Sequence, residues 1–139
     1  MQHFAILVVD DFKPFREVIC RALSEWDDIQ IVGQATDGLE AIEKASSLQP
    51  DLILLDIGLP KLNGIEAARK IRAASPSSKI LFCSLLASPT VVAEALRVGA
   101  NGYLLKTDAP DELLVAVQTV LEGAQFVSSQ LRRYQPNLR

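Results

Sequence analysis

The stretch from Asp51 to Gly64, DLILLDIGLPKLNG, constrains the fold more than any other part of the chain. Residues 52–55 are all Leu or Ile, and an uninterrupted apolar run of this length is typical of a strand buried on both faces, as in a parallel sheet. The run ends at one acidic residue, Asp56. Because open parallel sheets bind their ligands beyond the carboxyl ends of the strands, Asp56 is either a site residue or a simple cap of the following turn.

Four other apolar segments alternate with segments in which apolar residues recur at helical spacing. The predicted strands cover residues 4–9, 29–35, 52–55, 79–83 and 102–105. A helix is predicted after each strand, beginning near residues 12, 38, 64, 89 and 110. This alternation predicts an α/β fold, a doubly wound five-stranded parallel sheet flanked by five helices with right-handed crossovers.

The helical segments also predict which residues face the sheet. The apolar stripe of the first helix consists of Phe15, Val18, Ile19, Ala22, Leu23 and Trp26, and that of the second consists of Leu39, Ile42 and Leu48. Two pairs of residues, Asp37 with Glu40 and Asn63 with Glu66, have the spacing of capping boxes. These pairs predict the starts of the second and third helices.

Composition restricts the class of protein. A chain of 139 residues, 49% of them hydrophobic, suits one globular domain with a substantial core and is too short for two. The net charge of −3 does not indicate a nucleic-acid-binding surface. The apolar runs are shorter than the roughly 20 residues of a membrane span, and the start, MQHFAILVVDD, lacks a signal peptide's basic region and cleavage site. We therefore expect a cytoplasmic protein that contacts neither nucleic acid nor membrane through these residues. His3 is expected at the surface, and Cys20 and Cys83, without disulfide or metal spacing, are expected to be buried free thiols.

Polar side chains follow four of the five predicted strands: Asp10 and Asp11, Asp56, Ser84, and Lys106. Carboxylates brought close together repel one another unless a cation lies between them. Oxygen ligands without His or Cys favour Mg²⁺, and Lys and Ser side chains bind phosphoryl oxygens. This edge of the sheet therefore predicts a Mg²⁺-dependent phosphoryl site, in which an Asp can act as nucleophile and form an acyl phosphate.

These residues make a family resemblance visible. VVDD at residues 8–11, LLDIGLPKLNG at 54–64, Ser84, and YLLK at 103–106 together resemble the receiver domain of two-component response regulators, which has a flavodoxin-like fold. The resemblance runs from about residue 4 to residue 125. It implies a receiver domain over residues 1–125 and a C-terminal linker or tail over 126–139. The stretches GANGYLLK and GAQFVSSQL are most similar to receivers that precede a helix-turn-helix output domain.

The resemblance implies a role for each acid at the site. Asp56 matches the phosphoacceptor, which receives its phosphoryl group from a sensor histidine kinase. Asp11 and Asp56 match the acids that contact Mg²⁺, and Asp10 matches an acid that reaches the ion largely through water. Gly58 matches the residue whose backbone carbonyl is a further ligand.

The resemblance also implies how phosphorylation is read out. Ser84 and Lys106 match the hydroxyl and ammonium groups that hold the phosphoryl oxygens, and Tyr103 matches an aromatic residue that changes rotamer on activation. The expected output is a change in the face formed by residues 88–121, which would control a DNA-binding output domain not contained in this chain, another partner, or formation of a homodimer. Such a protein is not an enzyme beyond its own phosphotransfer and autodephosphorylation.

The loop after Ser84 departs from the family pattern. It begins with Leu85 and Leu86, where the family generally has a small residue followed by polar or acidic ones. A bulky Leu85 predicts restricted access to Asp56 or restricted motion of Tyr103, and Leu86 offers no polar group to orient an attacking water. One alternative is therefore a receiver-like interaction module that is not phosphorylated.

A second alternative is an aspartyl-phosphate phosphatase of the haloacid dehalogenase type, which uses similar groups on a doubly wound sheet. Its nucleophile lies in an Asp-x-Asp motif after the first strand. Here residues 10–12 read Asp-Asp-Phe, which lacks that spacing. The sequence favours the receiver over this alternative.

Overall fold

The computed structural model describes residues 3–134, in which one parallel sheet carries all the strands. The strands are β1 (Phe4–Val9), β2 (Ile29–Ala35), β3 (Leu52–Leu55), β4 (Lys79–Ser84), β5 (Gly102–Leu105) and β6 (Phe126–Val127). The helices are α1 (Lys13–Ser24), α2 (Gly38–Leu48), α3 (Gly64–Ala74), α4 (Pro89–Arg97), α5 (Ala109–Leu121) and α6 (Ser129–Tyr134). The predicted doubly wound α/β fold is confirmed, with one strand and one short helix more than the sequence predicted.

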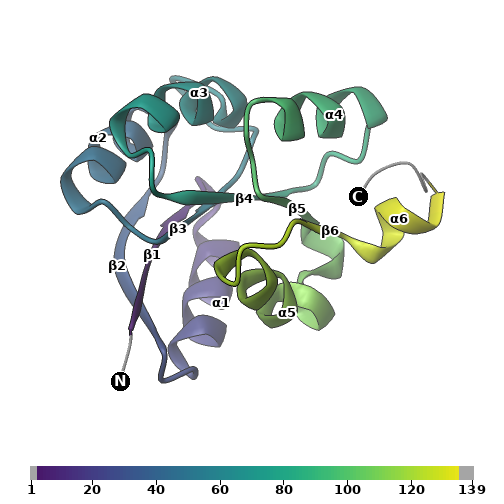
Figure 1. Ribbon diagram of the computed structural model, residues 1–139, viewed down its shortest axis with the longest axis horizontal. Coiled ribbons are helices and arrows are strands. Elements are labelled where there is room, and N and C mark those ends of the chain that lie inside the picture. Colours follow the sequence, from purple (N-terminus) through teal and green to yellow (C-terminus); the bar gives the residue numbers. More distant parts are fainter. Residues whose placement is uncertain (1–2, 135–139) are drawn as a thin grey trace.

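The strand order is β2-β1-β3-β4-β5-β6, so the chain changes direction across the sheet between β1 and β3. Figure 1 shows α2, α3 and α4 on one face of the sheet and α1 and α5 on the other. Two apolar clusters fill the spaces between the helices and the sheet, one on each face. The runs of buried residues in β1 and β3 follow from this double cover.

The pairing register places particular residues side by side at the carboxyl edge. Val9 pairs with Leu55, so the residues that follow, Asp10 and Asp56, leave neighbouring strands at the same level. Ser84 pairs with Leu105, the residue before Lys106. The sheet therefore delivers these four polar residues to one edge.

Both predicted helix starts are confirmed. The Asp37 carboxylate accepts a hydrogen bond from Glu40 N at 2.8 Å, and the Asn63 side chain accepts one from Glu66 N at 3.0 Å. The Glu40 carboxylate in turn accepts from Thr36 N at 2.7 Å, one residue earlier than an ideal capping box. Each cap satisfies backbone donors that a helix start leaves unpaired.

Several predicted inward residues are exposed. Val18 of α1 is 56% exposed and Leu39 of α2 is 53% exposed, and Leu48 is also exposed. The side of α2 that packs inward consists instead of small residues, Gly38, Ala41 and Ala45, which allow a close approach. Ile42 is partly buried as predicted.

Residues 126–134 form β6 and α6, where the sequence predicted a linker or tail; the rest of that prediction, residues 135–139, lies outside the described residues. Phe126 and Val127 pair with Gly102 and Tyr103 of β5, and α6 follows at the end of the sheet (Figure 1). A two-residue strand has too few positions to show a period, so the sequence pattern could not indicate it. The sheet consequently has six strands.

His3 is exposed and Cys83 is buried, as predicted, whereas Cys20 is only partly buried; both thiols are free. Among the described residues, no helix combines the length and the apolar character that crossing a bilayer requires.

Candidate functional site

Three carboxylates gather where β1 and β3 end. Asp10 follows β1 and Asp56 follows β3, and both are buried; Asp56 is 7% exposed. Asp11 is exposed. One carboxylate oxygen from each of the three residues lies within 4.8 Å of those of the other two. The predicted acidic cluster is thus formed by residues more than forty positions apart in the chain.

Lys106 joins the two buried acids. Its Nζ lies 2.8 Å from Asp10 Oδ2 and 3.1 Å from Asp56 Oδ2. The other side of the ammonium group lies 4.6 Å from the ring centroid of Phe15, a cation–π distance. Lys106 begins a single 3-10 turn, Lys106–Asp108, directly after β5, which brings its side chain across the carboxyl edge.

The main chain fixes the orientation of both buried carboxylates. Asp10 Oδ1 accepts from Phe12 N, and Asp56 Oδ1 accepts from Ile57 N, each at 2.8 Å. In both acids the remaining oxygen, Oδ2, therefore faces Lys106. The site is organised around two carboxylate oxygens that share one ammonium group.

The charges in the site shift one another's protonation. Burial raises the pKa of Asp56; the positive charge of Lys106 opposes this rise, and the negative charge of Asp10 adds to it. Desolvation lowers the pKa of Lys106, but its hydrogen bond to Asp10 and the charge of Asp56 outweigh desolvation and raise it. Lys106 is therefore held in its charged form, while Asp56 carries a negative charge at an energetic cost.

Gly58 and Gly64, which both follow Asp56, differ in the space that a side chain would have. A Cβ on Gly64 would lie 2.0 Å from the Asp56 carbonyl oxygen, so the start of α3 packs directly against the backbone of Asp56. Gly64 N also donates to Ile57 O at 2.7 Å. Gly58 is exposed, and a Cβ there would meet nothing within 4 Å. The structure leaves the predicted role of the Gly58 carbonyl as a prediction.

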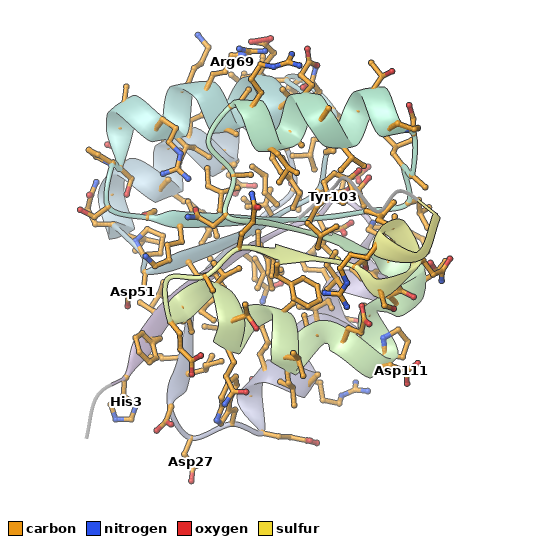
Figure 2. All side chains as sticks on the ribbon, turned by 45° about the vertical axis from the view of Figure 1, so that its right-hand side comes forward. His3, Asp27, Asp51, Arg69, Tyr103 and Asp111 are labelled. Carbon is orange, nitrogen blue, oxygen red and sulfur yellow. The ribbon has the colours of Figure 1, made fainter. Side chains whose placement is uncertain are left out.

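Ser84 and Tyr103 both hold the loop that follows β4. Ser84 Oγ accepts from Leu86 N at 3.1 Å, and Tyr103 Oη donates to Leu86 O at 2.6 Å. Figure 2 shows Tyr103 in the interior of the molecule, and its burial raises the pKa of the phenol to about 12. The two predicted switch residues thus share one contact, the main chain of Leu86.

Leu85 lies on the outer side of this loop. It is 70% exposed and lines a cavity of about 450 Å³ together with Phe12, Phe15, Lys106 and Thr107. The cavity is adjacent to the Lys106 ammonium group, so an apolar surface borders the approach to the site. Phe12 and Phe15 were not predicted as neighbours of the site, because their position follows from the direction in which α1 leaves β1.

The donor set fits a hard divalent cation. Asp10, Asp11 and Asp56 offer only carboxylate oxygens, which Mg²⁺ prefers to nitrogen or sulfur. The exposed Asp11 leaves one side of the cluster open to solvent, as suits an ion that keeps several waters. The cluster itself was predicted from strand ends alone.

Comparison with known proteins gives one consistent result. A sequence model of the family described as "Response regulator receiver domain" matches residues 6–118. The chain is 40% identical over 126 residues to the nitrate/nitrite response regulator protein NarL of Escherichia coli strain K12, covering 91% of this chain and 58% of that protein. It is 36% identical over 126 residues to the transcriptional regulatory protein LnrK of Bacillus subtilis, again over 91% of this chain and over 57% of that protein.

Solved structures agree with the sequence relatives. The signal receiver domain of the putative response regulator NarL from Mycobacterium tuberculosis superposes with a TM-score of 0.84 at 34% identity, covering 88% of this chain and 99% of that one. A LuxR-family two-component response regulator from Aurantimonas gives a TM-score of 0.90 at 30% identity, covering 95% and 94%. The chain spans less than two thirds of the curated relatives named above. From the matched residues, the fold and these relatives, this chain belongs to the response regulator receiver domain family.

Proposed function

We propose that the chain is a phosphorylation-activated switch of a two-component system, with Asp56 as the phosphoacceptor. One observation carries this proposal: a buried Asp56 oxygen faces Lys106 beside two further acids. The phosphoryl donor is a phosphohistidine on a sensor histidine kinase. An Asp56 oxygen bonds to phosphorus as the phosphorus–nitrogen bond of the donor breaks, and the imidazole leaves with the electron pair.

Each site residue has a defined task in this proposal. Asp10, Asp11 and Asp56, with the Gly58 carbonyl, would hold Mg²⁺, which neutralises negative charge on the transferring group. Lys106 exchanges part of its pairing with Asp10 and Asp56 for a phosphoryl oxygen, because charge-assisted hydrogen bonds to phosphate are strong. Asp56 remains fixed by its hydrogen bond from Ile57 N.

Ser84 and Tyr103 are the proposed switch. When the Ser84 hydroxyl turns to donate to a phosphoryl oxygen, it releases Leu86 N, and the loop that also binds Tyr103 Oη must rearrange. The arrangement favoured by the phosphoryl group becomes the dominant one, as in any population shift. The output is then a change in the face formed by α4, β5 and α5.

The names of the relatives support a role in gene regulation. LnrK is described as a transcriptional regulatory protein, and this chain matches only 57% of its length. We infer that the receiver acts in the cytoplasm, controls a DNA-binding output domain or a protein partner, and forms a homodimer on activation. Its only chemistry is its own phosphotransfer and autodephosphorylation.

Phosphoryl uptake tests the proposal. After incubation with Mg²⁺ and a small-molecule phosphodonor such as acetyl phosphate, the intact mass of the wild type is expected to increase by one phosphoryl group. Asp56→Asn is expected to show no adduct, since an amide is not a nucleophile of this kind. Asp111→Asn, which changes an exposed acid on α5 (Figure 2), is the matched control and is expected to be phosphorylated like the wild type. A wild type without adduct would favour the unphosphorylated interaction module.

The two leucines of the loop after β4 lead to a kinetic prediction. Leu86 offers the site only its main-chain groups, and Leu85 places an apolar side chain beside Lys106, so neither leucine supplies a polar side chain to orient an attacking water. Leu86→Asn is expected to accelerate dephosphorylation of Asp56 by about tenfold, less than the roughly hundredfold or more of general acid–base catalysis, because an amide orients a water without taking its proton. Leu85→Ala is expected to accelerate phosphorylation by small donors. Gain of the mass adduct with time measures phosphorylation and its loss measures dephosphorylation, and unchanged rates in the two variants would contradict the kinetic role of the loop.

A further inference from the structure

The segment after α5 returns to the strand that leads to Lys106. Val127 of β6 pairs with Tyr103 of β5, and Ser128 N donates to Tyr103 O at 2.9 Å. Leu131 of α6 is buried in the same apolar cluster as Tyr103. Figure 1 shows α6 beside the end of the sheet formed by β5 and β6. This segment therefore contacts the switch residue through both main chain and side chains.

Ser128 extends the strand pairing with its side chain. It is fully buried, and its Oγ accepts a hydrogen bond from Leu105 N at 2.9 Å. Leu105 immediately precedes Lys106. Glu112 of α5 accepts from Ser128 Oγ at 3.5 Å and from Ser129 N at 3.1 Å. The hydroxyl of Ser128 is thus fixed between the end of β5 and the start of α5.

The other end of the turn that carries Lys106 is held by the same segment. Asp108, which ends that turn, is buried, and its carboxylate accepts from Gln130 Nε2 at 2.8 Å and from Gln130 N at 3.4 Å. Ser128 and Gln130 consequently bind the residue before the three-residue turn and the residue that ends it. Neither Ser128 nor Gln130 belongs to the acidic cluster, so their contacts affect the site through the position of Lys106.

We propose that Ser128 and Gln130 are positioning residues for Lys106, which couple occupancy of the phosphoryl site to the docking of α6. The inference rests on the proposed function of Asp56. A phosphoryl group draws the Lys106 ammonium toward new oxygens, and a shift of the main chain at Lys106 strains or relieves the hydrogen bonds at Leu105 and Asp108. Because a coupling free energy is reciprocal, docking of α6 must in turn change the affinity of the site.

The simpler role for this segment is structural. β6 and α6 cover the edge of β5, which would otherwise leave unpaired backbone groups. In that case Ser128→Ala would lower the free energy of unfolding but leave the affinity of the site for a phosphoryl analogue unchanged. Ligand affinity therefore separates the two roles, whereas stability does not.

The experiment uses the 139-residue chain with Mg²⁺ and beryllofluoride as the phosphoryl analogue. Amide exchange is followed by NMR at Leu131 and Arg132, whose N–H groups donate to Ser128 O at 3.0 and 3.1 Å. In the wild type, beryllofluoride is expected to change the exchange rates of these amides about fivefold, since coupling is reciprocal. Ser128→Ala and Gln130→Ala are each expected to weaken beryllofluoride binding about fivefold and to reduce that response, at the lower end of typical coupling.

Ser129→Ala is the matched control, because Ser129 contacts Glu112 through its main-chain N–H and keeps that group after substitution. Its beryllofluoride affinity is expected to stay within about twofold of the wild type, well below the expected coupling. Gln130 is only partly buried, so Gln130→Ala provides a second test if Ser128→Ala does not fold.

Two outcomes would overturn the inference, and they differ. If the wild type binds beryllofluoride while the exchange of Leu131 and Arg132 and the affinities of Ser128→Ala and Gln130→Ala are unchanged, the coupling is wrong and the proposed function stands. If the wild type does not bind beryllofluoride in the presence of Mg²⁺, both the coupling and the proposed function are overturned.

Discussion

Lys106→Met is expected to lower the free energy of unfolding by about 3 kcal/mol in the absence of Mg²⁺, as for other buried ion pairs that lose one partner. Lys106 is the shared cation for Asp10 and Asp56, at 2.8 and 3.1 Å. Its removal leaves two buried carboxylates whose oxygens lie within 4.8 Å of each other without that counter-charge. Urea unfolding at neutral pH in the presence of EDTA measures the loss.

Three controls identify the cause of this loss. Lys106→Arg keeps the positive charge and is expected to lose less stability than Lys106→Met. Adding Asp56→Asn to Lys106→Met removes one of the repelling charges and is expected to recover more than half of the loss. Mg²⁺ is expected to restore stability to Lys106→Met for the same reason. Equal stability of Lys106→Met and the wild type in EDTA would show that the pairing contributes nothing net.

Asp56 is expected to contribute to the pH dependence of stability without Mg²⁺. Because burial raises the pKa of Asp56 above its ordinary value of 3.8, the folded state binds its proton more tightly than the unfolded state does. The contribution of the Asp56 carboxyl to the free energy of unfolding therefore decreases as the pH rises from about 3.8 through the raised pKa. Above the raised pKa this contribution is constant. Asp56→Asn is expected to remove this dependence, and unfolding in urea at a series of pH values would detect it.

Gly64→Ala is expected to destabilise the protein by about 3 kcal/mol, at the upper end of typical overpacking costs. Helix propensity alone predicts the opposite, since Ala is favoured over Gly within a helix by about 1 kcal/mol. Here the added Cβ would lie 2.0 Å from the Asp56 carbonyl oxygen and 2.8 Å from Ile57 Cα, and neither backbone atom can rotate away. The clash outweighs the gain in propensity, and it displaces the backbone that carries Asp56.

Gly58→Ala is the matched control, because it changes a glycine in the same loop where a Cβ would meet nothing within 4 Å. Its free energy of unfolding is expected to stay within about 0.5 kcal/mol of the wild type, as for other exposed substitutions. Thermal unfolding separates the two variants, since about 1 kcal/mol corresponds to a change of several degrees in Tm for a domain of this size. A Gly64→Ala protein as stable as Gly58→Ala would show that α3 can move away from Asp56 without cost.

The sequence predicted the centre of the site because a parallel sheet converts strand ends into neighbours. The apolar runs before Asp10 and Asp56 were sufficient to place both acids at one edge, and the observed pairing of Val9 with Leu55 brings them together. The presence of Lys106 on that edge followed from the same rule. No pattern in the sequence indicated that Lys106 pairs with both acids or that it begins a 3-10 turn.

Two kinds of structural feature could not be predicted from the sequence. The exposure of Leu39 arises because α2 approaches the sheet through Gly38 and Ala41, so small residues, which carry little periodic signal, form its buried face. The hydrogen bond from Leu105 N to the Ser128 hydroxyl depends on the pairing of a two-residue strand, β6, with β5. Both depend on distances between segments that are remote in the chain.

The strand order also bears on how the chain folds during synthesis. β3 is added beside β1, and each strand from β4 to β6 is added beside the strand made before it, so a nascent chain can enlarge its sheet without inserting a strand between two others. Asp10 and Asp56 can therefore meet before translation reaches Lys106. During this interval the two carboxylates repel each other without the Lys106 ammonium group. Mg²⁺ from solution is then the available counter-ion for the incompletely synthesised domain.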